Sequence, residues 1–312
     1  MKRIIFSLAI VITTIMIMSS CSDDSALVVN TANSKNSSSV TEISLNINSG
    51  IDVSEESSTF SNSSAVKAST RSTTSTSTNF SAKLPPQFTA YFVAAEATSE
   101  YTQGAIVRKI SVSTGNNNNI SVPAIKYHIY VTNYDPANAP TADKNSNQES
   151  AVKALENSLP ENTTTLYLYG TNDADFSSTT STANATVTLT NYYAAVCVAN
   201  NGHVKSVSYK DGTETTNYAL DSTNQWYYMY VKAPTDGTTS NTDFTVTVEN
   251  LAGIPDGREY TFSEEVTADN IYQYTVNEKG GLIITVNAFE GVKPTTTHYH
   301  VDSNSGNLIK DN

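Results

Sequence analysis

Residues 184–209 read NATVTLTNYYAAVCVANNGHVKSVSY, and this stretch decides the fold class. Its first part, Ala185 to Thr190, alternates apolar and polar residues with the period of two that is typical of a β-strand. Tyr192 to Ala199 follows as a more apolar strand. Asn200-Asn201-Gly202 then favours a hairpin turn into a third strand, Val204 to Tyr209. Three strands in so short a stretch predict an all-β protein.

The same pattern extends in both directions from this stretch. Further strands are predicted at 88–94, 105–112, 120–122, 127–134, 165–170, 226–231, 243–249, 259–262, 271–276 and 282–289. Gly, Asn and Asp turns separate them, which is typical of a β-sandwich. The one predicted helix runs from Gln148 to Leu159, where Val152 and Leu155 share a face, and Pro160 ends it.

An N-terminal strand precedes this region. In Val40 to Ile47, the residues Ile43, Leu45 and Ile47 alternate with polar residues. A weaker strand is predicted around Ile51 and Val53. Residues 54–81 are dominated by Ser and Thr and cannot bury enough apolar surface to fold alone, so we predict a linker there.

The chain therefore divides into five predicted segments. They are a signal peptide at 1–20, a flexible tether at 21–39, an N-terminal β-sandwich domain at 40–183 that includes the linker 54–81, a C-terminal β-sandwich domain at 184–292 and a polar tail at 293–312. The tail is expected to be solvated, because only Tyr299 and Val301 alternate in it.

The first residues predict export and lipidation. Lys2 and Arg3 precede an apolar run that is too short to span a membrane and has the length of a signal-peptide core. The run ends in Met18-Ser19-Ser20-Cys21, which resembles a bacterial lipobox and predicts a lipid on Cys21. Ser22, Asp23 and Asp24 resemble the acidic surface-export signal of Bacteroides-type lipoproteins. The alternative is a secreted protein with an incidental cysteine and an acidic linker.

Composition excludes some partners and favours an extracellular setting. The formal net charge is −12, so the chain would repel nucleic acid and anionic membrane surfaces, and we expect neither as a partner. Only 15% of the residues are charged, which leaves Ser, Thr, Asn and Tyr to form most of the polar surface. With Cys21 lipidated, Cys197 has no partner within the chain and is predicted to pack in the core.

The sequence gives no sign of catalysis. It contains no nucleotide loop, zinc pattern or nucleophile motif, so we predict a protein that is not an enzyme and has no cofactor or metal. Loop carboxylates remain candidates for calcium, although they lack EF-hand spacing. These are Asp135, Asp143, Asp173 and Asp175.

Tyrosine is abundant, with 18 residues, and its densest cluster lies in 226–230. On a strand, Trp226, Tyr228 and Tyr230 share one face. Exposed aromatic rings on such a face would stack on sugars, which makes these residues candidates for glycan contact. The alternative is that the face belongs to the core.

Taken together, the chain resembles the fimbrillin-like lipoproteins of Bacteroides-type bacteria. Ile43 to Val53, followed by Thr70-Arg71-Ser72, is similar to that family's first strand ahead of an arginine-protease site. Residues 183–209 resemble the opening of its second domain, and 271–286 resemble its closing hairpin. Residues 123–131 resemble a strand of transthyretin-like sandwiches. The resemblance implies two tandem Greek-key transthyretin-like β-sandwich domains.

The resemblance also implies a mechanism. In such pilins, cleavage after an arginine releases the first strand, and the groove that it leaves accepts a strand of the next subunit. Here Arg71 would be the cleavage residue, and Ile43, Leu45 and Ile47 would be the groove-filling residues. The polar tail is a poor donor strand, which favours a tip, anchor or accessory subunit.

We therefore expect a non-enzymatic lipoprotein of the bacterial outer membrane, displayed at the cell surface and acting in a pilus and in cell adhesion. Its expected partners are the membrane, through the lipid, and other pilus subunits or host ligands. The alternative is a surface glycan-binding lipoprotein of a polysaccharide-uptake system.

Overall fold

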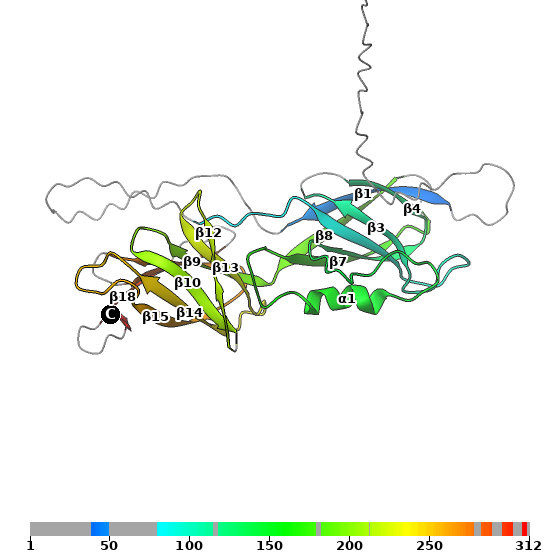
Figure 1. Cartoon of the computed structure of the whole chain (residues 1–312). Helices are drawn as coiled ribbons and strands as arrows, with labels where there is room; N and C mark the ends of the chain where they lie inside the picture. Colours follow the sequence, from blue (N-terminus) through cyan, green and yellow to red (C-terminus); the bar gives the residue numbers. More distant parts are fainter. Residues whose placement is uncertain are drawn as a thin grey trace, which may run out of the picture. The chain divides into compact units, whose positions relative to one another are not determined.

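The computed structural model describes residues 39–49, 80–114, 118–178, 182–211, 213–277, 282–288, 295–301 and 308–310. Within them, strands dominate and α1 (Glu149–Asn157) is the one helix, so the predicted all-β class with a short helix is confirmed (Figure 1). The strands are β1 (Val40–Asn48), β2 (Phe88–Ala94), β3 (Ile106–Val112), β4 (Asn118–Pro123), β5 (Lys126–Thr132), β6 (Asn162–Thr163), β7 (Leu168–Asp175), β8 (Thr182–Asn191), β9 (Tyr193–Ala199), β10 (Val204–Asp211), β11 (Glu214–Asn217), β12 (Ala219–Asp221), β13 (Trp226–Lys232), β14 (Ser240–Val248), β15 (Glu259–Val266), β16 (Asn270–Val276), β17 (Leu282–Ala288), β18 (Thr295–Val301) and β19 (Leu308–Lys310).

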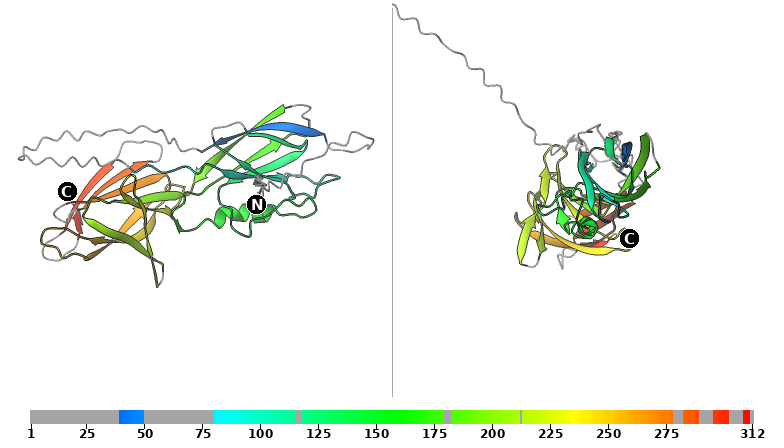
Figure 2. Two further views of the ribbon diagram at one scale, coloured as in Figure 1. Left: turned by 45° about the horizontal axis from the view of Figure 1, so that its top comes forward. Right: turned by 90° about the vertical axis from the view of Figure 1, so that its right-hand side faces the viewer.

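The first group of strands has the order β3-β2-β5-β7-β8-β1-β4 and folds into two layers. Its layers share β8, because Thr182–Thr188 pair with β1 and Leu189–Asn191 pair with β7. In Figure 2, β1 is the blue strand, and it lies alongside the cyan and green strands of this group. The side chains between the layers form a continuous hydrophobic core.

Gly170 permits β8 to pass from one layer to the other. A Cβ atom at this position would lie 2.4 Å from the backbone oxygen of Thr188, which is the last residue of β8 paired with β1. Leu189, the next residue of β8, pairs with Gly170 itself. The absence of a side chain thus allows the two backbones to approach closely at the crossing point.

Helix α1 covers the outer face of the β2-β5-β7 layer. Its buried residues Val152 and Leu155 pack against Tyr91, Tyr130 and Tyr169. Consecutive residues of β2 are therefore buried on both faces, toward the core and toward the helix. The helix also hydrogen-bonds to this sheet, because the Tyr130 hydroxyl donates to Glu149 Oε1 at 2.7 Å.

The second group of strands forms a four-stranded sheet, β11-β10-β14-β15, and a larger sheet, β12-β13-β9-β16-β17-β18-β19, with β6 paired to β13. A separate hydrophobic cluster contains residues of β9, β10, β13, β14 and β16. Ala194, Val196 and Val198 of β9 belong to this cluster. The opposite face of β9 is buried as well, since Tyr193 and Cys197 belong to the first core.

Residues 184–209 form the predicted strands, but the predicted hairpin at Asn200-Asn201-Gly202 is wrong. β9 pairs with β13 and β16, whereas β10 pairs with β11 and β14, so the two strands lie in different sheets. The connection carries the chain across the sandwich, and Gly202 has a positive φ of 85° within it.

Two further expectations are corrected. The segment predicted as a solvated polar tail contains β18, which pairs with β17, and β19, which pairs with β18. Backbone hydrogen bonds, which need no apolar alternation, place β18 in the sheet. Asp173 and Asp175, predicted to lie in loops, are residues of β7.

The boundary predicted near residue 183 falls within β8, which hydrogen-bonds to β1 and β7. The described residues belong to one compact unit, and the division into two domains stays a prediction. We propose that such a boundary lies after Asn191, where the chain leaves the first group of strands.

Candidate strand-exchange site

β1 is an interior strand of its layer, with hydrogen-bonded neighbours on both edges. On one edge it runs antiparallel to β4, from the pair Val40↔Pro123 to the pair Leu45↔Asn118. On the other edge it runs parallel to β8, from Glu42↔Thr182 to Asn48↔Thr188. β1 thus joins β4 to the rest of its layer.

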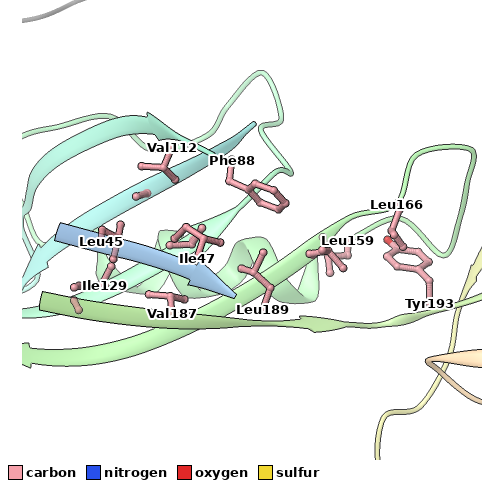
Figure 3. Packing of buried hydrophobic residues seen from close by; sticks show 14 of the residues in the cluster. Leu45, Ile47, Phe88, Val112, Ile129, Leu159, Leu166, Val187, Leu189 and Tyr193 are labelled. Atoms are coloured by element: carbon pink, nitrogen blue, oxygen red, sulfur yellow. The ribbon is translucent and has the colours of Figure 1, made fainter. Parts of the chain in front are cut away.

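The inward side chains of β1 fill the first core. Ile43 is 1% exposed, Leu45 is 0% exposed and Ile47 is 6% exposed. Figure 3 shows Leu45 and Ile47 projecting among buried side chains of neighbouring strands, including Val187 and Phe88. The predicted groove-filling residues are thereby brought together on one buried face of one strand.

Polar contacts fix the β4 edge of the strand. The Asn118 side chain donates from Nδ2 to the Leu45 carbonyl at 3.1 Å, and the Ser121 hydroxyl donates to Glu42 Oε1 at 2.6 Å. Beyond the start of β1, the backbone N–H of Ala124 donates to the Ser39 carbonyl at 2.7 Å. These contacts specify where β1 sits along β4.

Sequence reasoning missed the residues that surround β1. Thr41 is a fourth inward residue of the strand and is 1% exposed. Asn118 and Ser121 of β4 were not singled out, since Asn118 falls in a run of asparagines that resembles a turn. The signal that could have found Thr41 is its alternation in phase with Ile43 and Leu45.

The residues predicted for lipidation, export and cleavage lie outside the described residues. These are Cys21, Ser22, Asp23, Asp24 and Arg71, together with the weak strand predicted at Ile51 and Val53. Lipidation, export and cleavage therefore stay predictions.

The aromatic residues proposed for glycan contact lie on a packed face. Trp226 and Tyr230 are each 3% exposed, and Tyr228 is partly buried. Phe80, which precedes β2, packs against two of them, with its ring centroid 5.4 Å from that of Tyr228 and 6.4 Å from that of Tyr230, and it belongs to the same core cluster as Trp226. Lys83 follows along the same segment and lies 3.6 Å from Asp221. This burial supports the alternative, in which the face is part of the core.

Replacing Phe80 with alanine is expected to uncover this face. The lost ring contacts should lower the free energy of unfolding by about 2–4 kcal/mol. Trp226 is the chain's single tryptophan, so its fluorescence emission should shift to longer wavelength. The exposed neighbour Ser81, replaced with alanine, is the matched control and should change neither quantity. Unchanged emission in Phe80→Ala would show that the segment does not shield Trp226.

The carboxylates considered for calcium have protein partners. Asp173 Oδ1 lies 2.6 Å from His128 Nδ1, and Lys109 Nζ donates to Asp135 Oδ1 at 3.1 Å. Asp143 accepts a hydrogen bond from the backbone of Asn145, and Asp175 accepts from Ser177. Among the residues that the structure describes, no group of three or more His, Cys, Asp or Glu side chains could hold a metal ion.

Cys197 is fully buried, as predicted, and burial raises the pKa of its thiol well above the ordinary value. The reactive thiolate is therefore disfavoured. Within the described part of the chain, no helix is both long and apolar enough to cross a bilayer.

No family model matches the chain, and no curated protein matches it in sequence. Solved structures do resemble it. A fimbrial assembly protein from Parabacteroides distasonis has 11% identity and a TM-score of 0.42, covering 82% of this chain and 98% of its own. The fimbrial anchor protein Mfa2 from Porphyromonas gingivalis has 12% identity and a TM-score of 0.34, covering 88% and 100%.

A third structure, of the tip fimbrial protein Mfa3 from Porphyromonas gingivalis, has 8% identity and a TM-score of 0.31, covering 67% of this chain and 92% of its own. All three are described as fimbrial proteins. The function of this chain is inferred below from the geometry of β1.

Proposed function

We propose that this chain is a non-enzymatic, lipid-anchored surface protein that acts in pilus assembly and adhesion as a tip, anchor or accessory subunit. Its assembly step is the replacement of β1 by a strand of another subunit. The observation that carries the proposal is the position of β1. This strand is hydrogen-bonded on both edges, and its side chains Ile43, Leu45 and Ile47 are buried in the core.

The chemistry of this position suits strand addition. A strand that takes the place of β1 would gain main-chain hydrogen bonds from β4 and β8, and its alternate side chains would enter the core. The residues that would line the emptied groove are apolar: Ile120 and Val122 on β4, and Ala185 and Val187 on β8. An empty groove of this kind exposes apolar surface and unpaired backbone groups, so it favours a new strand.

Arg71 lies between β1 and β2 in the sequence. A cut after Arg71 would separate β1 from β2 and from every later strand, including its neighbours β4 and β8. One cleavage would therefore convert β1 from a covalent part of the sandwich into an exchangeable one.

The same cut would determine the role of Cys21. The lipidated residue lies upstream of β1, so cleavage after Arg71 would detach the folded strands from the lipid once β1 leaves. Cys21 then serves as a transport device for a subunit. If Arg71 stays intact, Cys21 is a permanent outer-membrane anchor and the protein is an accessory lipoprotein.

Treatment with an arginine-specific protease tests the proposal. After removal of the signal peptide, the remaining arginines are Arg71, Arg108 and Arg258, and the fragment masses identify which one is cut. We expect cleavage after Arg71, followed by higher-order species in size-exclusion chromatography, alone or with a second pilus subunit. The Arg71→Lys variant should stay intact at this position and monomeric.

Resistance of Arg71 would contradict the processing step and leave the accessory role, whereas trimmed protein that remains monomeric with every pilus subunit offered would contradict strand exchange. A surface glycan-binding lipoprotein is the alternative function. Its candidate residues Trp226 and Tyr230 are buried, which disfavours stacking on sugars unless the Phe80 segment moves away.

A further inference from the structure

The outward face of β1 carries a specific contact with β4. Glu42 is opposite Ser121 in the antiparallel register, and the Ser121 hydroxyl donates to Glu42 Oε1 at 2.6 Å. The distance is typical of a hydroxyl that donates to a carboxylate, and it is shorter than most hydrogen bonds between neutral groups. This contact links a side chain of the exchangeable strand to a side chain that would stay in the groove.

Ser121 is also joined to β3. The guanidinium of Arg108 donates from Nη1 to the Ser121 carbonyl at 2.5 Å. β3 and β4 are the two ends of the strand order, so this contact bridges the open side of the first sandwich. Ser121 thus offers a hydroxyl donor to β1 while it is bound to a cationic side chain, an arrangement that favours a carboxylate on the incoming strand.

The Glu42–Ser121 contact forms only in one alignment, or register, of β1 against β4. A slip of β1 by one residue would turn Glu42, Ser44 and Asn46 into the core, so the apolar pattern already prevents it. A slip by two residues would keep apolar side chains inward, and it would move Glu42 away from Ser121. The Glu42–Ser121 contact therefore helps to distinguish the correct register from the in-phase alternatives.

We infer that the groove between β4 and β8 selects a strand with a carboxylate or amide acceptor immediately before three alternating aliphatic residues, running in the direction of β1. This inference rests on the proposed function and names the kind of partner that the site takes. The partner is a strand of a different polypeptide chain.

Apart from β1 itself, each described strand of this chain either lacks such a pattern or is paired on both edges, as β8 is with Asn184 before Ala185, Val187 and Leu189. The last long strand, β18, has the sequence TTTHYHV, which lacks both the acidic residue and the aliphatic alternation. β14 contains Asp243 followed by Phe244, Val246 and Val248, but it is paired on both edges with β10 and β15. Among its described strands, a second copy therefore offers only β1 itself as a source of the strand.

The test uses the full mature chain with the recognition sequence of a second, highly specific protease in place of residues 69–74. β1 can then be cut free whether or not Arg71 is a natural cleavage site. The N-terminal fragment that contains β1 is then removed in mild urea, the remaining protein is mixed with fluorescent peptides, and capture is measured by anisotropy. The peptides are VTEISLNIN, its Glu42→Gln and Glu42→Lys versions, and a Leu45→Asp version in which the aliphatic row is interrupted.

We expect capture of VTEISLNIN and of the Glu42→Gln peptide with similar affinity, since the amide oxygen can accept from Ser121. The Glu42→Lys peptide should bind about tenfold more weakly, and the Leu45→Asp peptide weaker still, because Leu45 is fully buried. In a Ser121→Ala protein, the difference between the Glu and Lys peptides should shrink, which assigns it to this contact.

Equal capture of all four peptides would overturn the inferred preference and leave strand exchange itself intact. Capture of none would overturn both the preference and the proposed function. Failure of natural cleavage at Arg71, together with selective capture here, would count against the processing step alone.

Discussion

Leu45→Asp is expected to displace β1 from the first sandwich. Leu45 is 0% exposed and lies in the middle of the inward row of β1. A carboxylate there would have no cation beside it in the apolar core, and burying it unpaired costs several kcal/mol. We expect a loss of about 4–5 kcal/mol or more in the free energy of unfolding, measured by urea denaturation.

Ser44→Asp is the matched control, because it adds the same charge one residue away on the outward face of the same strand. It should change the free energy of unfolding by less than about 1 kcal/mol. Equal stability of the two variants would show that the Leu45 position tolerates water and that β1 does not fill a closed core.

Gly170→Ala is expected to disrupt the crossing of β8 between the two layers. The new Cβ would lie 2.4 Å from the Thr188 carbonyl oxygen and 3.0 Å from its carbon, which are backbone atoms that cannot rotate away. The strands must separate, at a cost of about 3 kcal/mol. Thermal unfolding should show the loss, and amides of β7 and the end of β8 should exchange faster with solvent.

Gly237→Ala separates crowding from backbone strain. Gly237 has a positive φ of 83°, and a Cβ atom there would meet nothing within 4 Å. Its replacement should cost only about 1 kcal/mol, from the left-handed conformation. If Gly170→Ala were the milder of the two changes, close approach of β7 and β8 would not be the reason for a glycine at position 170.

The sequence predicts strands better than it predicts their partners. Period-two alternation located β8 and the strand from Val40, and the helix was predicted within two residues of its ends. The hairpin after β9 was wrong for a physical reason. β9 is buried on both faces, so its side chains carry no alternation that would indicate which neighbouring strand it pairs with.

For the candidate site, the sequence predicts the buried residues of β1 but not the strands that pair with it. Ile43, Leu45 and Ile47 were identified because alternation marks a buried face. The parallel partner β8 lies far along the chain, and single-sequence pattern does not encode such long-range pairing. Glu42 and Ser121 show no local signal, since their contact exists only once β1 and β4 are in register.

The exposure of the aromatic face of β13 could not be predicted from the sequence pattern. The pattern correctly places Trp226, Tyr228 and Tyr230 on one face, but it does not say what covers them. Phe80 packs against Tyr228 and follows directly after a Ser/Thr-rich segment. That segment contains few apolar residues, so its sequence does not predict that its end packs on this face. Contact with Phe80 and burial in the first core together make this candidate binding surface part of the core.

The central claim is that β1 is a replaceable strand, and hydrogen exchange after cleavage at Arg71 tests it most directly. Amides of β4 and of Thr182–Thr188 in β8 are the ones to follow, because these strands pair with β1. We predict that they lose protection when the cut N-terminal fragment is removed in mild urea, and regain it when the peptide VTEISLNIN is added. Protection that stays the same with and without the fragment would contradict the claim.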